Sequence, residues 1–317
     1  MSDQSPPIIP PETAIERAVA GLIAGELVGM PTETVYGLAA DATSAHAVAC
    51  VYSAKQRPDI NPLIAHVADL AGAEREGVFD ARARALAVRF WPGPLTLIVP
   101  ANPSGTVCEL ARAGLPTLGL RVPAHPVANQ LLRAIGRPLA APSANPSGRI
   151  SPTAADEVAG AFGCEVSMVI DGGRCRAGIE STILSVLPGE PIRVLRPGAL
   201  AREVLLEVAG ELAAAEVGKI SAPGQLSSHY APNATVRLNV TAPVAGEVWL
   251  GFGRDCRSAD LNLSQSGDVI EAAANLYQML RRLDATGAQA IAVAPIPLQG
   301  LGEAINDRLT RAAAPRA

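Results

Sequence analysis

The stretch ELVGMPTETVYGL, residues 26–38, marks a change from an apolar strand to a polar turn. Its mostly apolar start, residues 26–30, predicts a short strand, and Glu33, Thr34 and Tyr36 crowd polar groups just after it. Ligands often bind where the carboxyl ends of strands meet the edge of a sheet. An ordinary polar turn that caps a following helix explains the same residues, so both interpretations stay open at this point.

Segments with helical and strand patterns alternate on both sides of this turn. We expect helices at residues 12–24, 45–54, 81–90, 127–135 and 153–161. We expect strands at residues 26–30, 63–67, 95–99, 117–122, 138–141, 166–170, 182–187 and 192–195. This alternation predicts an α/β or α+β domain whose sheet is mostly covered.

A segment rich in Pro, Ser and Gly interrupts this pattern at residues 221–233, SAPGQLSSHYAPN. Such a composition is typical of a linker between domains. The shorter remainder predicts strands at 235–240, 247–251 and 288–294, and helices at 268–283 and 303–311. The sequence therefore predicts a large domain at residues 1–220, a linker at 221–234, and a small α/β domain at 235–317.

The composition excludes several classes of protein. With 317 residues, 49% of them hydrophobic and 18% charged, the chain can bury a sizeable core. Its net charge of −4 argues against a general nucleic-acid coat protein, although a local basic groove is compatible with it. Five scattered cysteines without a CxxC pair favour neither a disulfide framework nor a zinc site. Because neither a secretory signal nor a membrane span is discernible, we expect a cytoplasmic protein without membrane contacts.

The chain has 26 basic residues, and only Lys55 and Lys219 among them are lysines. Codon bias in a GC-rich genome explains the preference for arginine but leaves open why Lys55 is retained. Lys55 and Arg57 follow a predicted helix, where an ammonium and a planar guanidinium could clamp a triphosphate. Two cations at a helix end also complement the helix dipole without any ligand. His66, in an apolar strand, is more typical of a core histidine than of a ligand contact.

Two loops combine small residues with hydrogen-bonding groups. Residues 141–148, APSANPSG, follow an apolar strand, and hydroxyl and amide groups such as those of Ser143 and Asn145 can donate to phosphate oxygens. The chain has no Walker motif, and a proline-rich loop with a helix cap is the alternative. The glycines of DGG, residues 171–173, and GIEST, residues 178–182, fit either a turn around a ligand or a simple hairpin.

Arg121 and Arg196 are single arginines inside apolar strands. A buried cation requires a partner of opposite charge. The carboxylate or phosphate of a substrate could be this partner, and so could an internal Asp or Glu.

These clusters, in this order, resemble the YrdC-like threonylcarbamoyl-AMP synthases in their long, two-domain form. The resemblance extends from Pro31 to Leu200 over PTETVYGL, KQRPDINPLIAHV, WPGPLTLIV, LGLRVPAHP, APSANPSG, DGG, GIESTILSV and VLRPGAL. The segments SSHYAPN and GLGEAINDRLTRAA are similar to the long form specifically. The resemblance implies a twisted, open, mixed α/β sheet with a concave, positively charged face, followed by a small Rossmann-like α/β domain.

The resemblance also implies a reaction, in which L-threonine, bicarbonate or CO2, and ATP give threonylcarbamoyl-AMP and pyrophosphate. The chain would then be a nucleotidyltransferase, with ATP as a substrate and Mg²⁺ bridging its phosphates. A downstream transferase complex would move the threonylcarbamoyl group to the adenosine beside the anticodon of tRNA, and the chain itself could also contact tRNA.

The motifs of the family assign candidate site residues. Those implied to contact threonine are Thr34, His66, Arg121, Ala141 and Ser181. Those implied to contact ATP are Lys55, Arg57, Asn61, Thr117, Ser143, Asn145, Ser151, Arg196, Tyr230 and Asn233. Lys55 and Arg57 would be the catalytic pair, and no side chain is expected to bind a metal ion directly. His229 and Tyr230 in the linker would lie over the nucleotide.

Two other functions remain as alternatives. Relatives of this domain have been proposed to bind double-stranded RNA or tRNA through the basic concave face without catalysis. Similar domains also carry out a carbamoyl-adenylating step in hydrogenase maturation, inside much larger zinc-finger proteins. The short chain and its lack of zinc-ligand cysteine sets argue against this last function.

Overall fold

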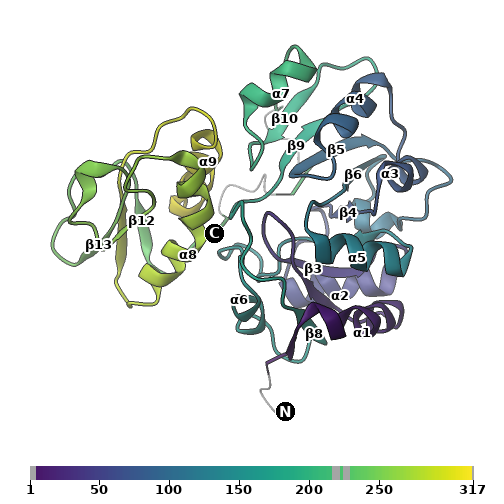
Figure 1. The fold of residues 1–317 in the computed structure, drawn as a ribbon, viewed down its shortest axis with the longest axis horizontal. Helices are drawn as coiled ribbons and strands as arrows, with labels where there is room; N and C mark the ends of the chain where they lie inside the picture. Colours follow the sequence, from purple (N-terminus) through teal and green to yellow (C-terminus); the bar gives the residue numbers. More distant parts are fainter. Residues whose placement is uncertain (1–4, 216–221, 224–228, 316–317) are drawn as a thin grey trace.

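The computed structural model describes residues 5–215, 222–223 and 229–315. Figure 1 shows a large body that contains the N-terminal elements and a smaller body formed by the residues after the linker. The predicted linker, residues 221–234, is described only at 222–223 and 229–234, and Lys219 also lies outside the described residues. The exact domain boundaries remain predictions.

One mixed sheet forms the centre of the large body. In spatial order its strands are β1 (Ile8–Ile9), β8 (Met168–Ile170), β2 (Val28–Met30), β3 (Gly37–Asp41), β7 (Leu139–Ala140), β4 (Ile64–His66), β6 (Thr117–Arg121), β5 (Leu95–Pro100), β9 (Thr182–Ser185), β10 (Arg193–Arg196) and β11 (Ala213–Ala214). Parallel pairs such as β4 with β6 occur beside antiparallel pairs such as β5 with β6. The predicted mixed α/β sheet is confirmed.

Helices pack against both faces of this sheet. They are α1 (Pro11–Ile23), α2 (Ala45–Lys55), α3 (Leu70–Glu76), α4 (Ala81–Phe90), α5 (Pro126–Ile135), α6 (Ala155–Ala159) and α7 (Arg202–Ala209), with a 3-10 turn at Glu109–Arg112. Alternate residues of a strand point to opposite faces. Leu38 and Ala40 of β3 accordingly share a core with α2, whereas Ala39 between them shares a core with α1 and α5.

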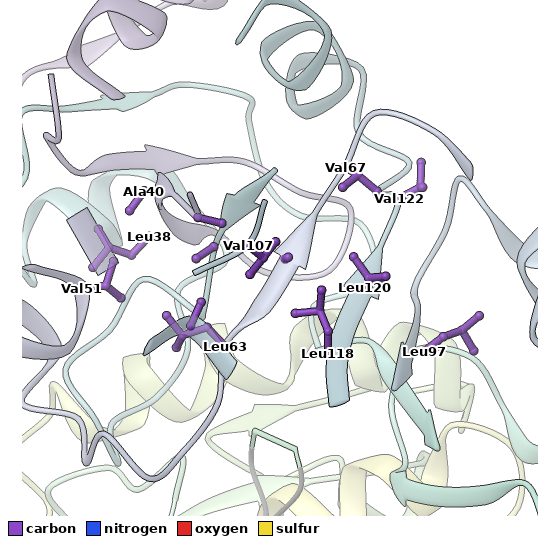
Figure 2. Close-up of a cluster of buried hydrophobic side chains, with 14 of the residues drawn as sticks. Leu38, Ala40, Val51, Leu63, Val67, Leu97, Val107, Leu118, Leu120 and Val122 are labelled. Atoms are coloured by element: carbon purple, nitrogen blue, oxygen red, sulfur yellow. The ribbon is translucent and has the colours of Figure 1, made fainter. Parts of the chain in front are cut away.

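Figure 2 shows the core on the α2 side of the sheet. Leu38 of β3, Val51 of α2, and Leu118 and Leu120 of β6 are all exposed by 2% or less. Burial of each such side chain stabilises the fold by about 1.5–3 kcal/mol. Because Leu118 and Leu120 fill this face, the alternate residue Arg121 faces the opposite side, where the candidate site lies.

The small body contains a second sheet and two long helices. Its strands, in spatial order, are β12 (Thr235–Arg237), β15 (Ala290–Val293), β13 (Glu247–Gly251) and β14 (Leu261–Asn262). Its helices are α8 (Val269–Asp284) and α9 (Gly302–Ala313), with a 3-10 turn at Arg254–Cys256. All three strand pairs are parallel. A parallel sheet with crossover helices confirms the predicted Rossmann-like α/β fold.

The structure excludes two of the alternatives that the sequence left open for the loops. The polar turn after β2 leads into β3, which pairs antiparallel with β2, and not into a helix. The glycine-rich segment between β8 and β9 is not a hairpin, because these strands are not neighbours in the sheet. The sequence pattern also fails to predict the strands β1, β3, β11 and β14 and the helices α3 and α7.

Among the described residues, none of the helices is both long enough and apolar enough to cross a membrane. All five cysteines are free thiols. The cytoplasmic location remains a prediction.

Candidate functional site

Polar side chains from adjacent strands meet on one face of the large sheet. Since β4 and β6 are parallel, their register places His66 beside Arg121. Both side chains are buried, with 2% and 4% exposure. Ala141 joins them from the end of β7, where its N–H donates to the carbonyl of Ile64 at 3.2 Å. The sheet therefore brings an imidazole, a guanidinium and a backbone segment to the same place.

The turn between β2 and β3 adds a carboxylate to this place. Glu33 Oε1 lies 2.7 Å from Arg121 Nη2, and both side chains are almost fully buried. The hydroxyl groups of Thr32 and Thr34 lie 2.8 Å apart, and the Thr32 hydroxyl donates to the carbonyl of Val35 at 2.6 Å. The buried cation thus has an internal partner, one of the two possibilities that the sequence leaves open.

Two further arginines make the site cationic. Arg57 donates to the carbonyls of Asn61 at 3.1 Å and Pro62 at 3.0 Å. Arg196 donates from Nη2 to the carbonyl of Ser181 at 2.8 Å and to its hydroxyl at 3.2 Å. Burial lowers the pKa of Arg57 to about 10, so this guanidinium stays charged at neutral pH. Backbone acceptors hold both groups in place without neutralising them.

Lys55 lies behind the loop at residues 141–148 and not on the cavity surface. Its side chain is 1% exposed, and its ammonium donates to the carbonyl of Ser143 at 2.6 Å and to that of Asn145. Burial, and to a lesser degree the charge of Arg57, lower the pKa of Lys55 well below its usual value. In this structure Lys55 fixes the loop, and its contact with a triphosphate remains a prediction.

His229 and Tyr230, near the end of the predicted linker, line the cavity. Tyr230 is 1% exposed and has a left-handed backbone with φ of 62°. The N–H of Ala231 donates to the carbonyl of Gly148 at 2.8 Å, which ties the linker to the large body. Burial lowers the pKa of His229 to about 3, so its imidazole is neutral at physiological pH.

The small body reaches the cavity through Glu180. The Glu180 carboxylate accepts hydrogen bonds from Ser151 at 2.6 Å, from Tyr277 of α8 at 2.8 Å, and from Nε of Arg308 of α9 at 2.8 Å. All four side chains are buried. One carboxylate thus joins the cavity wall to both helices of the small body.

The space between the atoms that line this partly open cavity amounts to about 550 Å³, a volume that includes open solvent. The predicted site residues that line it are Thr34, Arg57, His66, Arg121, Ala141, Ser143, Ser181, Arg196 and Tyr230. Those that do not line it are Lys55, Asn61, Thr117, Asn145, Ser151 and Asn233. Asn145 and Asn233 instead line a neighbouring cavity between the two bodies. Thr117 lies at the opposite end of β6 from Arg121, paired with Pro100.

Several buried polar atoms around the cavity lack a hydrogen-bond partner. Within the described part of the chain, this holds for both amide atoms of Asn61 and for Nδ1 of His66 and of His229. A buried polar atom without a partner is costly, and such atoms are typical of sites that complete their hydrogen bonds with a ligand. The arrangement fits a ligand that carries both an anionic group and several hydrogen-bonding groups.

Sequence reasoning assigned no role to Glu180, Tyr277 and Arg308. A signal for the last one exists in the sequence, because Arg308 interrupts the apolar stripe of Ile305 and Leu309 on one helix face. No comparable signal marks Glu180, whose partners come from the other body.

Gly178 lies where the two bodies touch. It has φ of +70°, and a Cβ at this position would lie 2.5 Å from Ala274 Cα and 2.6 Å from the carbonyl oxygen of Ala273 in α8. We expect Gly178→Ala to destabilise the protein by about 3 kcal/mol, of which about 1 kcal/mol is the cost of the left-handed backbone. Gly189→Ala is the control, since Gly189 has φ of +75° but open space around its Cβ. Equal urea midpoints for the two variants would contradict the close packing of α8.

Glu180 should also give the stability a specific dependence on pH. Burial raises its pKa, but the positive charges of Arg308 and Arg196 and the hydrogen bond from Ser151 outweigh burial and lower it from 4.5 to about 2. This carboxylate therefore stabilises the fold fully above pH 4.5, and its contribution of about 3 kcal/mol is lost as the pH falls toward 2. Urea denaturation between pH 5 and pH 3 should show a steeper loss for the wild type than for Glu180→Gln. Parallel curves would contradict this assignment.

The residues that form most of the large sheet match a known protein family. The family model Sua5_yciO_yrdC, described as telomere recombination, matches residues 21–198. The chain therefore belongs to the Sua5/YciO/YrdC family. A second model, described as the C-terminal domain of threonylcarbamoyl-AMP synthase, matches residues 200–314, which associates the chain with the two-domain members.

Individual relatives agree with this two-domain organisation. The chain is 39% identical to the threonylcarbamoyl-AMP synthase of Pyrococcus abyssi, with 93% of each chain covered. It is 38% identical to the protein of that name from Bacillus subtilis, with 95% of this chain and 93% of the relative covered. The crystal structure of P. abyssi Sua5 complexed with L-threonine matches with a TM-score of 0.88 and 37% identity, over 96% of this chain and 97% of that one. These findings support the synthase over the RNA-binding alternative.

Proposed function

We propose that the chain is a threonylcarbamoyl-AMP synthase that uses L-threonine, bicarbonate or CO2, and ATP, and releases pyrophosphate. The observation that carries this proposal is one cavity lined by Arg57, Arg121 and Arg196, in which two carboxylates, Glu180 in the wall and Glu33 beside Arg121, leave positive charge in excess. Such an excess of positive charge suits a triphosphate together with the carboxylate of an amino acid.

Threonine would bind at the side of the cavity that holds Arg121 and His66. The guanidinium of Arg121 would bind the substrate carboxylate and keep its ion pair with Glu33 at the same time. Burial and the charge of Arg121 lower the pKa of His66 to about 3, so the imidazole is neutral and does not repel a substrate ammonium. Its unpartnered Nδ1 can accept a hydrogen bond from the hydroxyl or the ammonium of threonine.

ATP would bind at the side that holds Arg57, Arg196 and the loop at residues 141–148. The neutral amine of threonine attacks CO2 and releases a proton to solvent, which gives a carbamate. A carbamate oxygen then attacks the α-phosphorus, and the bond to pyrophosphate breaks in line. The protein needs no nucleophile for this reaction, because positioning and stabilisation of charge suffice. The buried His229 and Tyr230 would exclude water from the labile carbamate and mixed anhydride.

Mg²⁺ fits this site only together with the nucleotide. Among the described residues, no group of three or more His, Cys, Asp or Glu side chains is arranged to hold a metal ion. Mg²⁺ typically retains water and phosphate oxygens as ligands, and when bound it would neutralise charge on the phosphates. Its use, the nucleotidyltransferase class, the downstream transferase complex and any direct contact with tRNA belong to the proposal.

Pyrophosphate release tests the proposed function. Purified protein should release pyrophosphate from ATP only when L-threonine and bicarbonate are both present, and omission of either should reduce the rate to background. Release that does not depend on threonine would contradict the proposal, as would strong, salt-sensitive RNA binding without any turnover of ATP.

A further inference from the structure

Arg308 forms a buried cluster at the boundary between the small body and the cavity. Its side chain is fully buried, and its Nε lies 2.8 Å from Glu180 Oε2. Its guanidinium carbon lies 5.1 Å from the centre of the Tyr230 ring. Tyr230 in turn stacks on Tyr277 at 5.8 Å between ring centres, with 25° between the ring planes. One cation of α9 therefore contacts both a cavity carboxylate and the linker aromatic.

The negative charge of Glu180 makes its ion pair with Arg308 important for the binding of an anionic ligand. Glu180 lines the cavity in which Arg57 and Arg196 also lie. A buried carboxylate without a counter-ion would repel a polyphosphate at short range, because the surroundings screen charge poorly. Arg308 pairs with this carboxylate from behind the cavity wall, and Tyr277 donates a hydrogen bond to it. Arg196 adds a second positive charge near Glu180, and Arg308 also pairs with Asp307 at 2.6 Å.

The strained backbone of Tyr230 is a second observation that connects Arg308 with the cavity. A φ of 62° is rare for a bulky aromatic residue, and such strain persists only where surrounding contacts impose it. Tyr277 packs against one side of the Tyr230 ring, and the guanidinium of Arg308 forms a cation–π contact with it. These contacts hold Tyr230 in the wall of the cavity.

We infer that Arg308 of the small body is a positioning residue for the nucleotide side of the cavity, which it reaches through Glu180 and Tyr230. This inference rests on the proposed function. Since His66 and Arg121 lie on β4 and β6, outside the cluster of Arg308, Glu180, Tyr230 and Tyr277, the effect should be selective for ATP over threonine.

Steady-state kinetics of Arg308→Met test the inference. We expect the KM for ATP to rise about tenfold or more, while the KM for L-threonine changes by less than about threefold. Adding Glu180→Gln to this variant removes the uncompensated carboxylate and should restore part of the affinity for ATP. Arg202→Met is the matched control, since it breaks a different ion pair between the two bodies, Arg202 with Glu303 at 2.5 Å. The control should leave both KM values unchanged.

Four outcomes separate this inference from the proposed function. A wild type without threonine-dependent pyrophosphate release contradicts the function, and with it the inference. If the wild type is active but Arg308→Met and Arg202→Met have equal KM values for ATP, the inference alone is overturned. The same holds if the KM for ATP and the KM for L-threonine rise equally in Arg308→Met. If Arg308→Met does not fold, Tyr277→Phe removes only one hydrogen bond to Glu180 and should still raise the KM for ATP, by about threefold. An unchanged KM for ATP in Tyr277→Phe would then overturn the inference.

Discussion

An Arg121→Ala variant should lose threonine-dependent pyrophosphate release and bind L-threonine at least about a hundredfold more weakly. The guanidinium of Arg121 is buried beside His66, and its fixed partner Glu33 engages it from one side. Removal of Arg121 would take away the proposed counter-ion of the substrate carboxylate and leave Glu33 as an unpaired buried charge. Titration calorimetry with L-threonine measures the binding, and the pyrophosphate assay measures the turnover.

A second variant separates the substrate contact from the internal ion pair. Arg121→Ala combined with Glu33→Gln removes both buried charges, so it should regain stability but still fail to bind threonine. Arg133→Ala, an exposed position on α5, controls for loss of positive charge. Threonine binding of wild-type strength in the double variant would refute a role of Arg121 in holding the substrate carboxylate.

Lys55→Arg should reduce turnover by about tenfold to a hundredfold, although it conserves the charge. The Lys55 ammonium fits between the carbonyls of Ser143 and Asn145 in a fully buried space. A guanidinium is larger and planar, so it would displace the loop at residues 141–148 and cost about 2 kcal/mol of stability. The pyrophosphate assay and urea denaturation measure the two effects.

The control for this variant is a conservative exchange at an exposed position. Arg89→Lys on α4 lies in solvent and should change neither turnover nor stability. If Lys55→Arg turned over like the wild type, codon bias would remain a sufficient explanation for which positions carry lysine. A stable variant with low turnover would instead favour a direct contact between Lys55 and the triphosphate.

Strand patterns predicted most of the large sheet but not its order. The apolar runs at 63–67 and 117–122 became β4 and β6, yet their parallel pairing, which places His66 beside Arg121, depends on contacts distant in sequence. β3 was missed because its residues, GLAAD, include glycine, alanine and aspartate, which are all depleted in strands. Tertiary pairing with β2 and β7 forms this strand despite its low propensity.

The candidate site was predictable where a motif lies within one segment. Residues implied to contact threonine, such as Thr34 and Arg121, were assigned from such motifs and line one cavity. Their contact with threonine stays a prediction. The sequence could not decide whether Arg121 pairs with a substrate or with an internal acid, because Glu33 is far away along the chain. Glu180 and Arg308 were missed for the same reason, since their pairing exists only when the two bodies pack together.

Isotope incorporation tests the central claim most directly. Incubation of the protein with ATP, L-threonine and ¹³C-labelled bicarbonate should yield an adenylate whose mass, measured by mass spectrometry, equals threonylcarbamoyl-AMP and increases with the label. The label should disappear when threonine is omitted or when Arg121→Ala replaces the wild type. An adenylate that forms without incorporating the label, or no adenylate at all, would contradict the account.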